Sequence, residues 1–117
     1  MDLFEELEAK NVNVKEATER FVGNASLYKR MLLKFSDLIC DMAVNTDFDC
    51  DEYSIVIEKT HAIKGAAGNL SIKPVYEAYT EIVNLLRKNQ PEQAKLILEN
   101  IIPVQNDIID CIEKHLR

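Results

Sequence analysis

The residues best suited to chemistry in this chain lie between residues 60 and 70, around His61. If this stretch is helical, Lys64, Gly65 and Gly68 follow His61 by three, four and seven residues and share its surface patch. The apolar face of the same helix centres a quarter-turn or more away, so His61 should flank the core and still reach water. That apolar face comprises Val56, Thr60, Ile63 and Ala67.

Such a histidine could act as a nucleophile. An imidazole is largely uncharged near neutral pH, so one ring nitrogen can attack while the other keeps its proton. Attack on phosphorus gives a phosphoramidate and requires no general base. The ammonium group of Lys64, one helical turn away, would offset charge on the equatorial phosphate oxygens during transfer. Glu58, one turn before His61, is a candidate for orienting the imidazole proton, although glutamates in such positions are commonly only solvated.

The two glycines beside His61 need an explanation, because each glycine inside a helix costs roughly 1 kcal/mol relative to alanine. Bare backbone at Gly65 and Gly68 would let a partner bring a phosphorylated aspartate within bonding distance of the imidazole. We therefore expect both glycines to provide access for a docking partner. Gly68 has an alternative explanation as an ordinary helix C-cap, whereas Gly65 has none.

The motif His-x-x-Lys-Gly at 61–65, followed by Ala-Gly-Asn-Leu at 67–70, resembles the signature of bacterial histidine-containing phosphotransfer domains. The resemblance covers the chain from about residue 11 onward. It departs from the family pattern at Ser71, where a small glycine is usual, and at Val83, where an acidic residue is common. Other positions that fit the family are Ala17, Thr18, Glu19, Arg20, Phe21, Gly23, Tyr28, Leu32, Phe35, Leu86 and Arg87.

The resemblance implies a phosphocarrier of a two-component multistep phosphorelay, with no catalytic activity of its own. His61 would exchange a phosphoryl group with aspartates in the receiver domains of response regulators or of a hybrid sensor histidine kinase. The Mg²⁺ used in that exchange would belong to the receiver, so no cofactor is expected in this chain. We expect a single monomeric domain over 1–117. Met1 and the lack of a linker favour a free-standing protein over a segment of a larger kinase.

Two other functions remain open on the sequence. A helical adaptor could bind receiver domains by shape alone, without phosphotransfer, although the presence of His61 and Lys64 argues against it. A small hydrolase could use His61 as a general base. Neither an oxyanion site nor a second catalytic group with recognisable spacing supports the hydrolase.

Periodic apolar residues predict an all-α fold, an antiparallel up-down four-helix bundle with an additional short N-terminal helix. The short helix is expected at 13–21 after an Asn13 cap, and long helices at about 25–45, 51 to 68–70, from a Ser71 cap onward, and 91–115. Asp and Asn side chains at 45–49 should cap the second long helix. Residues 1–10 are expected to form an acidic extension outside the core of about 11–116, and Pro103 to kink or briefly break the last helix. The remaining core positions expected are Leu27, Met31, Phe35, Leu38, Met42, Ile72, Val75, Tyr79, Ile82, Leu86, Ala94, Ile97, Ile101, Val104, Ile108 and Cys111.

Composition narrows the function classes. Hydrophobic residues make up 47% and charged residues 29%, a balance typical of a globular domain. The net charge of -6 disfavours a nucleic-acid partner, because binding to the phosphate backbone needs clustered Lys and Arg. The chain has no signal-like start and no apolar run of membrane-spanning length, so a cytoplasmic location without membrane contact is expected.

The remaining residues with chemical potential are expected to be structural. Cys40, Cys50 and Cys111 show no CxxC spacing, which predicts reduced, buried thiols. No metal site is expected, because His61 has no further ligands on its face. His115 lies in the last helical turn, where a cation complements the helix dipole. The tyrosines at 28, 53, 76 and 79 are expected in the core or at its rim.

Overall fold

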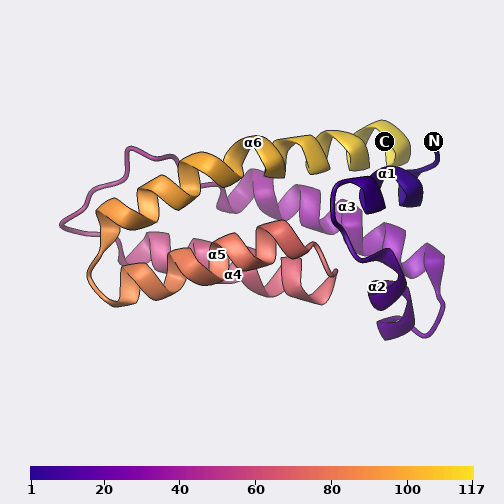
Figure 1. The fold of residues 1–117 in the computed structure, drawn as a ribbon, viewed down its shortest axis with the longest axis horizontal. Helices are drawn as coiled ribbons and strands as arrows, with labels where there is room; N and C mark the ends of the chain where they lie inside the picture. Colours follow the sequence, from indigo (N-terminus) through magenta and orange to yellow (C-terminus); the bar gives the residue numbers. More distant parts are fainter.

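The computed structural model describes residues 1–117 and is entirely helical, which confirms the expected fold class (Figure 1). The only strand-like pairing is an isolated bridge between Val12 and Ile72. None of the helices combines the length and the apolar content needed to cross a bilayer. The six helices are α1 (Leu3–Ala9), α2 (Val14–Arg20), α3 (Ala25–Met42), α4 (Ser54–Asn69), α5 (Lys73–Arg87) and α6 (Pro91–Leu116).

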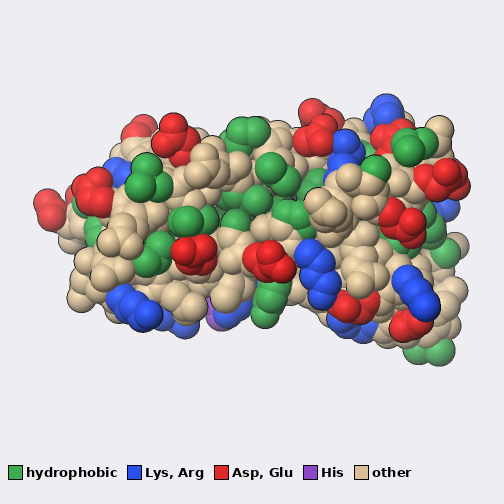
Figure 2. Space-filling model, in the orientation of Figure 1, with side chains coloured by type: hydrophobic (Ala, Val, Ile, Leu, Met, Phe, Trp, Pro, Cys, Tyr) green, Lys and Arg blue, Asp and Glu red, His purple; other side chains and the backbone are tan.

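The four longest helices, α3 to α6, form the body of an elongated molecule of 43 × 24 × 22 Å (Figure 2). The most extensive packing joins α4 to α5 and α5 to α6, and α3 contacts both α4 and α6. The two short helices sit at one end, where α1 packs on α6 and α2 on α1 and α3 (Figure 1). The helix that carries His61 is therefore held between α3 and α5.

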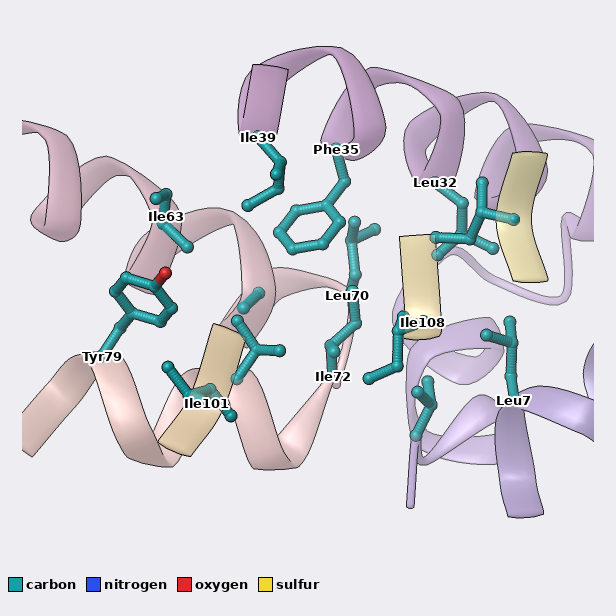
Figure 3. Close-up of a cluster of buried hydrophobic side chains, with 14 of the residues drawn as sticks. Leu7, Leu32, Phe35, Ile39, Ile63, Leu70, Ile72, Tyr79, Ile101 and Ile108 are labelled. Carbon is teal, nitrogen blue, oxygen red and sulfur yellow. The ribbon is translucent and has the colours of Figure 1, made fainter. Parts of the chain in front are cut away.

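The core contains the apolar stripes expected for α4 and α5. Thr60, Ile63 and Ala67 of α4 are buried and the expected Val56 is half-buried, while the expected positions from Ile72 to Leu86 are all buried. Figure 3 shows side chains of α3, α4, α5 and α6 converging on one interior, with Ile63 and Tyr79 near Phe35. Hydrophobic burial of this contiguous set is the main source of stability for a domain of this size.

The buried face of α3 differs from the expected one. Of the predicted stripe only Phe35 is fully buried, while the centre of the buried face lies along Tyr28, Leu32 and Ile39. The apolar residues of α3 cover a broad arc, and contacts with both α4 and α6 select the middle of that arc. In α6 the expected Val104 is 40% exposed, and Leu98, Gln105 and Ile112 are buried instead.

Residues 1–10 are not merely an extension, because α1 occupies most of them. Asp2 caps α1 by accepting a hydrogen bond from the Glu5 backbone N–H at 2.9 Å. Leu3 and Leu7, four residues apart, are buried in the same core as the long helices. The chain thus has two short N-terminal helices where one was expected.

Several predicted helix ends are confirmed and others are wrong. Asn13 caps α2 as expected, by accepting from the Glu16 N–H at 3.0 Å. α4 begins at Ser54 rather than near Asp51, and its cap residue Tyr53 makes no side-chain capping bond. The Asp and Asn side chains at 45–49 therefore do not cap α4.

Ser71 is not the cap of α5, which begins at Lys73 after an Ile72 cap position. Ser71 is buried in the left-handed region with φ +56°, and its hydroxyl serves α2 instead. A glycine would adopt this φ without strain, whereas an L-residue such as serine is uncommon there. Pro103 lies inside a continuous α6, so the expected break is absent, although the ribbon of α6 bends along its length (Figure 1).

Candidate functional site

His61 is exposed on α4, as the helical projection predicts. Its sequence neighbour Thr60 is fully buried and donates a hydrogen bond to the carbonyl of Val56 at 2.8 Å, which fixes the core side of the helix. The side-chain hydrogen bonds within α4 involve Thr60 and not His61 or Glu58. Glu58 is exposed and does not orient the imidazole in this structure. The ring nitrogens of His61 are therefore available to a ligand from outside.

Lys64 is the cation nearest in sequence to His61 on the same patch. It is half-buried, and none of the seven ion pairs of the protein includes it. Arg20 and Lys73, by contrast, both pair with Glu16. Lys64 thus keeps an ammonium group that no carboxylate of the protein neutralises.

Gly65 and Gly68 have different surroundings. A Cβ built on Gly65 would meet no atom within 4 Å, so the internal packing does not require a glycine there. A Cβ on Gly68 would lie 2.8 Å from both Cδ1 and Cε1 of Tyr76, so this position must stay bare to accommodate the tyrosine ring. Gly68 is also inside α4 and is not its C-cap, which is Leu70. Only Gly65 still needs an explanation from outside the fold.

The C-terminal end of α4 is held by α2. Arg20 donates hydrogen bonds to the carbonyl of Asn69 at 2.7 Å and to Ser71 Oγ at 3.1 Å, which places a cation at the negative end of the α4 dipole. Ser71 in turn donates to Glu16 Oε1 at 2.7 Å, and Lys73 donates to the same carboxylate at 3.0 Å. The Ser71 hydroxyl, followed by Lys73 and Arg20, lowers the pKa of Glu16 to about 2.

These groups border a shallow cavity of about 470 Å³ next to Gly65. Its two cations, Arg20 and Lys73, both pair with the single carboxylate of Glu16, so the three groups together keep one net positive charge. The surface beside Gly65 is open on this side. The lining residues are Glu16, Arg20, Gly65, Gly68, Asn69, Ser71, Lys73 and Tyr76.

A second cluster of reactive side chains, which sequence reasoning missed, lies where α1 meets α6. His115 Nε2 is 3.0 Å from Glu6 Oε1, and Cys111 Sγ is 3.4 Å from Glu6 Oε2. Hydrogen bonds from Lys114, then from His115, lower the pKa of Glu6 to about 2. Burial, followed by the hydrogen bond to Glu6, raises the pKa of Cys111 to about 11. The spacing of Cys111 and His115 by four residues was the available signal, but Glu6 could be added only with the tertiary structure.

The other cysteines and tyrosines are placed as follows. Of the three free cysteines only Cys111 is buried, whereas Cys50 is half-buried and Cys40 is exposed, so the expectation of buried thiols is wrong for Cys40. Tyr28 and Tyr79 are core residues, and Tyr76 is at the rim with 37% exposure.

Comparison of the chain with protein-family models, with curated proteins and with solved structures gives no match.

Proposed function

We propose that this chain is a histidine phosphocarrier, in which His61 accepts a phosphoryl group from one receiver-domain aspartate and passes it to another. The observation that carries the proposal is the combination at one surface of an exposed imidazole, an ammonium without an ion-pair partner and a glycine with open space around it. The resemblance of residues 61–70 to histidine-containing phosphotransfer domains points to the same chemistry.

The arrangement of the helices belongs to this proposal. We infer that α3 to α6 run alternately up and down as an antiparallel four-helix bundle, which the packing of α4 on α5, α5 on α6 and α3 on α4 and α6 supports. Such a bundle presents α4 on a rigid support. A cytoplasmic location and the absence of catalysis by the chain alone are parts of the same proposal.

Gly65 supplies the argument for a partner that comes close. A glycine in mid-helix costs roughly 1 kcal/mol relative to alanine, and no internal contact of Gly65 offsets this cost. A partner that must bring an aspartyl phosphate to the imidazole one turn away would be obstructed by a side chain at this position. Access for the partner is therefore the reason we assign to Gly65, and to Gly65 alone of the two glycines.

The transfer step needs few groups from this chain. A ring nitrogen of His61 attacks the phosphorus of the aspartyl phosphate, the N–P bond forms and the P–O bond to the aspartate breaks, so the carboxylate leaves with the electron pair. Lys64 offsets the charge on the phosphoryl oxygens during transfer and in the phosphohistidine. Mg²⁺ acts on the receiver side. The reverse sequence at a second receiver returns His61 to its starting state.

The test is to incubate the chain with a phosphorylated receiver domain and follow the label. We expect an acid-labile, base-stable label that His61→Gln abolishes. His115→Gln is the matched control, because His115 is the only other histidine in the chain, and it should keep the label. Retention of the label by His61→Gln would overturn the assignment. Tight receiver binding with no transfer in either direction would instead support a helical adaptor.

A further inference from the structure

The contact between α1 and the last turns of α6 brings together three side chains whose donor atoms are of three kinds. Glu6 offers a carboxylate oxygen, Cys111 a sulfur and His115 an imidazole nitrogen, and these atoms all lie within 4.8 Å of one another. Two of the separations are 3.0 Å, from His115 Nε2 to Glu6 Oε1, and 3.4 Å, from Cys111 Sγ to Glu6 Oε2. Figure 1 shows this end of the molecule, where α1 lies beside the C-terminal part of α6.

We propose that Glu6, Cys111 and His115 form a binding site for a divalent transition metal ion of the Zn²⁺ class. This site is separate from the His61 patch and does not depend on the phosphocarrier function. Zinc is bound in proteins by thiolate, imidazole and carboxylate at roughly 2.0–2.3 Å, which places neighbouring donors of a tetrahedron roughly 3–4 Å apart. The observed separations of 3.0 and 3.4 Å need only small side-chain movements to reach this arrangement.

The backbone pre-organises two of the three ligands. Cys111 and His115 are four residues apart on continuous helix α6, so their side chains lie on the same face one above the other. Glu6 comes from α1, which is anchored by the buried Leu3 and Leu7 on either side of it. A third ligand from a separate, fixed element is what distinguishes this cluster from two neighbouring side chains on one helix.

Burial and donor chemistry decide which ion fits. Cys111 is only 4% exposed, whereas the side chains of Glu6 and His115 are 18% and 22% exposed. The site is thus sheltered on the sulfur side and open on the other, where water can complete a fourth position. A sulfur and an imidazole donor favour Zn²⁺, Co²⁺ or Cu²⁺ over Mg²⁺ and Ca²⁺, which prefer oxygen ligands.

The charges balance when the ion enters. Cys111 loses its thiol proton to water on coordination, so a thiolate and the Glu6 carboxylate together match the charge of a divalent ion, and His115 binds in its neutral form. Lys114 now contacts both oxygens of Glu6 at 2.9 Å and is the cation that a metal would replace. Its side chain is 62% exposed, so it can move into water without leaving a buried charge. Lys10, the other lysine near the cluster, is paired with Asp107 at 2.7 Å.

Metal uptake would join α1 to α6. Because the unfolded chain does not hold these three side chains together, an ion bound to the folded state raises the unfolding temperature in proportion to the logarithm of its free concentration. Glu6 is the ligand that carries this link, since the other two ligands are on one helix. Loss of Glu6 should therefore weaken both metal binding and metal-dependent stabilisation.

The test uses the full chain, reduced and freed of metal, titrated with Co²⁺ and then with Zn²⁺. We expect saturable binding of one Co²⁺ per chain with a near-ultraviolet thiolate-to-cobalt charge-transfer band, displacement of Co²⁺ by Zn²⁺, and a higher unfolding temperature with Zn²⁺. Cys111→Ser should abolish the band, and His115→Gln and Glu6→Gln should each weaken binding at least about tenfold. Lys114→Ala should strengthen binding, because it removes the cation that competes for Glu6.

Matched controls separate this site from adventitious binding. The double variant Cys40→Ser/Cys50→Ser leaves Cys111 as the only thiol and should keep the full band. His61→Gln removes the other histidine, and Asp110→Asn removes an exposed carboxylate of α6 that makes no ion pair, and neither should change the affinity. His115→Gln keeps the test decisive if Cys111→Ser does not fold. Absence of saturable binding in the wild type, or unchanged binding in His115→Gln and Glu6→Gln, would overturn the proposal.

Discussion

The ring of Tyr76 lies so close to Gly68 that a Cβ on the glycine would be 2.8 Å from two ring carbons, whereas a Cβ on Gly65, one turn earlier, would meet nothing within 4 Å. The two glycines lie on the same helix and the same surface, but the reason for a glycine differs between the two positions. The Tyr76 ring accounts for Gly68, whereas no internal contact accounts for Gly65, for which we propose access by a partner.

Gly68→Ala should destabilise the protein by about 1 kcal/mol, because the cost of forcing Tyr76 aside exceeds the gain in helix propensity. In a Tyr76→Ala background the same change should become stabilising, since the obstruction is gone and only the propensity gain remains. Urea unfolding of the four proteins in the cycle gives both free-energy differences. Equal effects of Gly68→Ala in the two backgrounds would show that Tyr76 is not the reason for the glycine.

Gly65→Ala should stabilise the protein by roughly 0.5–1 kcal/mol, since the added methyl group meets open space and alanine favours the helix. Gly65→Glu should leave the fold near intact and block phosphotransfer, because its side chain obstructs the approach of the receiver. Unfolding free energies and transfer rates measured on the same preparations check both expectations. An unchanged transfer rate in Gly65→Glu would refute the access argument.

Lys64→Gln should slow phosphotransfer by about tenfold or more while changing stability little, because the lost ammonium acts on charge that develops during transfer. Lys59→Gln is the control, since it removes a lysine from the same helix at a position that does not share the His61 patch. Rapid-quench rates for both variants with one phosphorylated receiver make the comparison. Equal rates for the two variants would remove Lys64 from the site.

Glu16 should make stability depend on pH. Its pKa is about 2 in the folded protein, against 4.5 as the ordinary value, because Ser71, Lys73 and Arg20 bind its ionised form. Between these values the unfolded chain takes up a proton that the folded chain does not, so the stabilisation is complete above about pH 4.5 and is lost as the pH falls towards 2. The difference in unfolding free energy between wild type and Glu16→Gln should shrink over this range. Parallel pH profiles would contradict the role given to Glu16.

The sequence was sufficient to predict burial where a helix has a single well-defined apolar face. The α5 stripe from Val75 to Leu86 is buried throughout because its helix has a narrow apolar face with polar residues opposite. The exposure of His61 followed from the same reasoning on α4. The buried face of α3 was harder to predict, because the apolar residues of this helix span a wide arc. Packing against α4 and α6 buries Tyr28, Leu32 and Ile39 at the middle of that arc.

The sequence was insufficient where the contact partner is distant along the chain. Ser71 looked like a helix cap, but its hydroxyl bonds to Glu16, 55 residues away. Gly68 looked like an access residue or a cap, and only the position of the Tyr76 ring explains it. Glu6 meets Cys111 and His115 through a contact between the two ends of the chain, which no local pattern encodes.

The measurement that tests the central claim most directly is the location of the phosphoryl group on the intact chain after incubation with a phosphorylated receiver. Tandem mass spectrometry of peptides, prepared and separated under alkaline conditions that preserve phosphohistidine, gives the modified residue. We predict that the group is on His61 and on no other residue. A group found on His115, on a hydroxyl or carboxylate side chain, or on no residue at all would contradict the account.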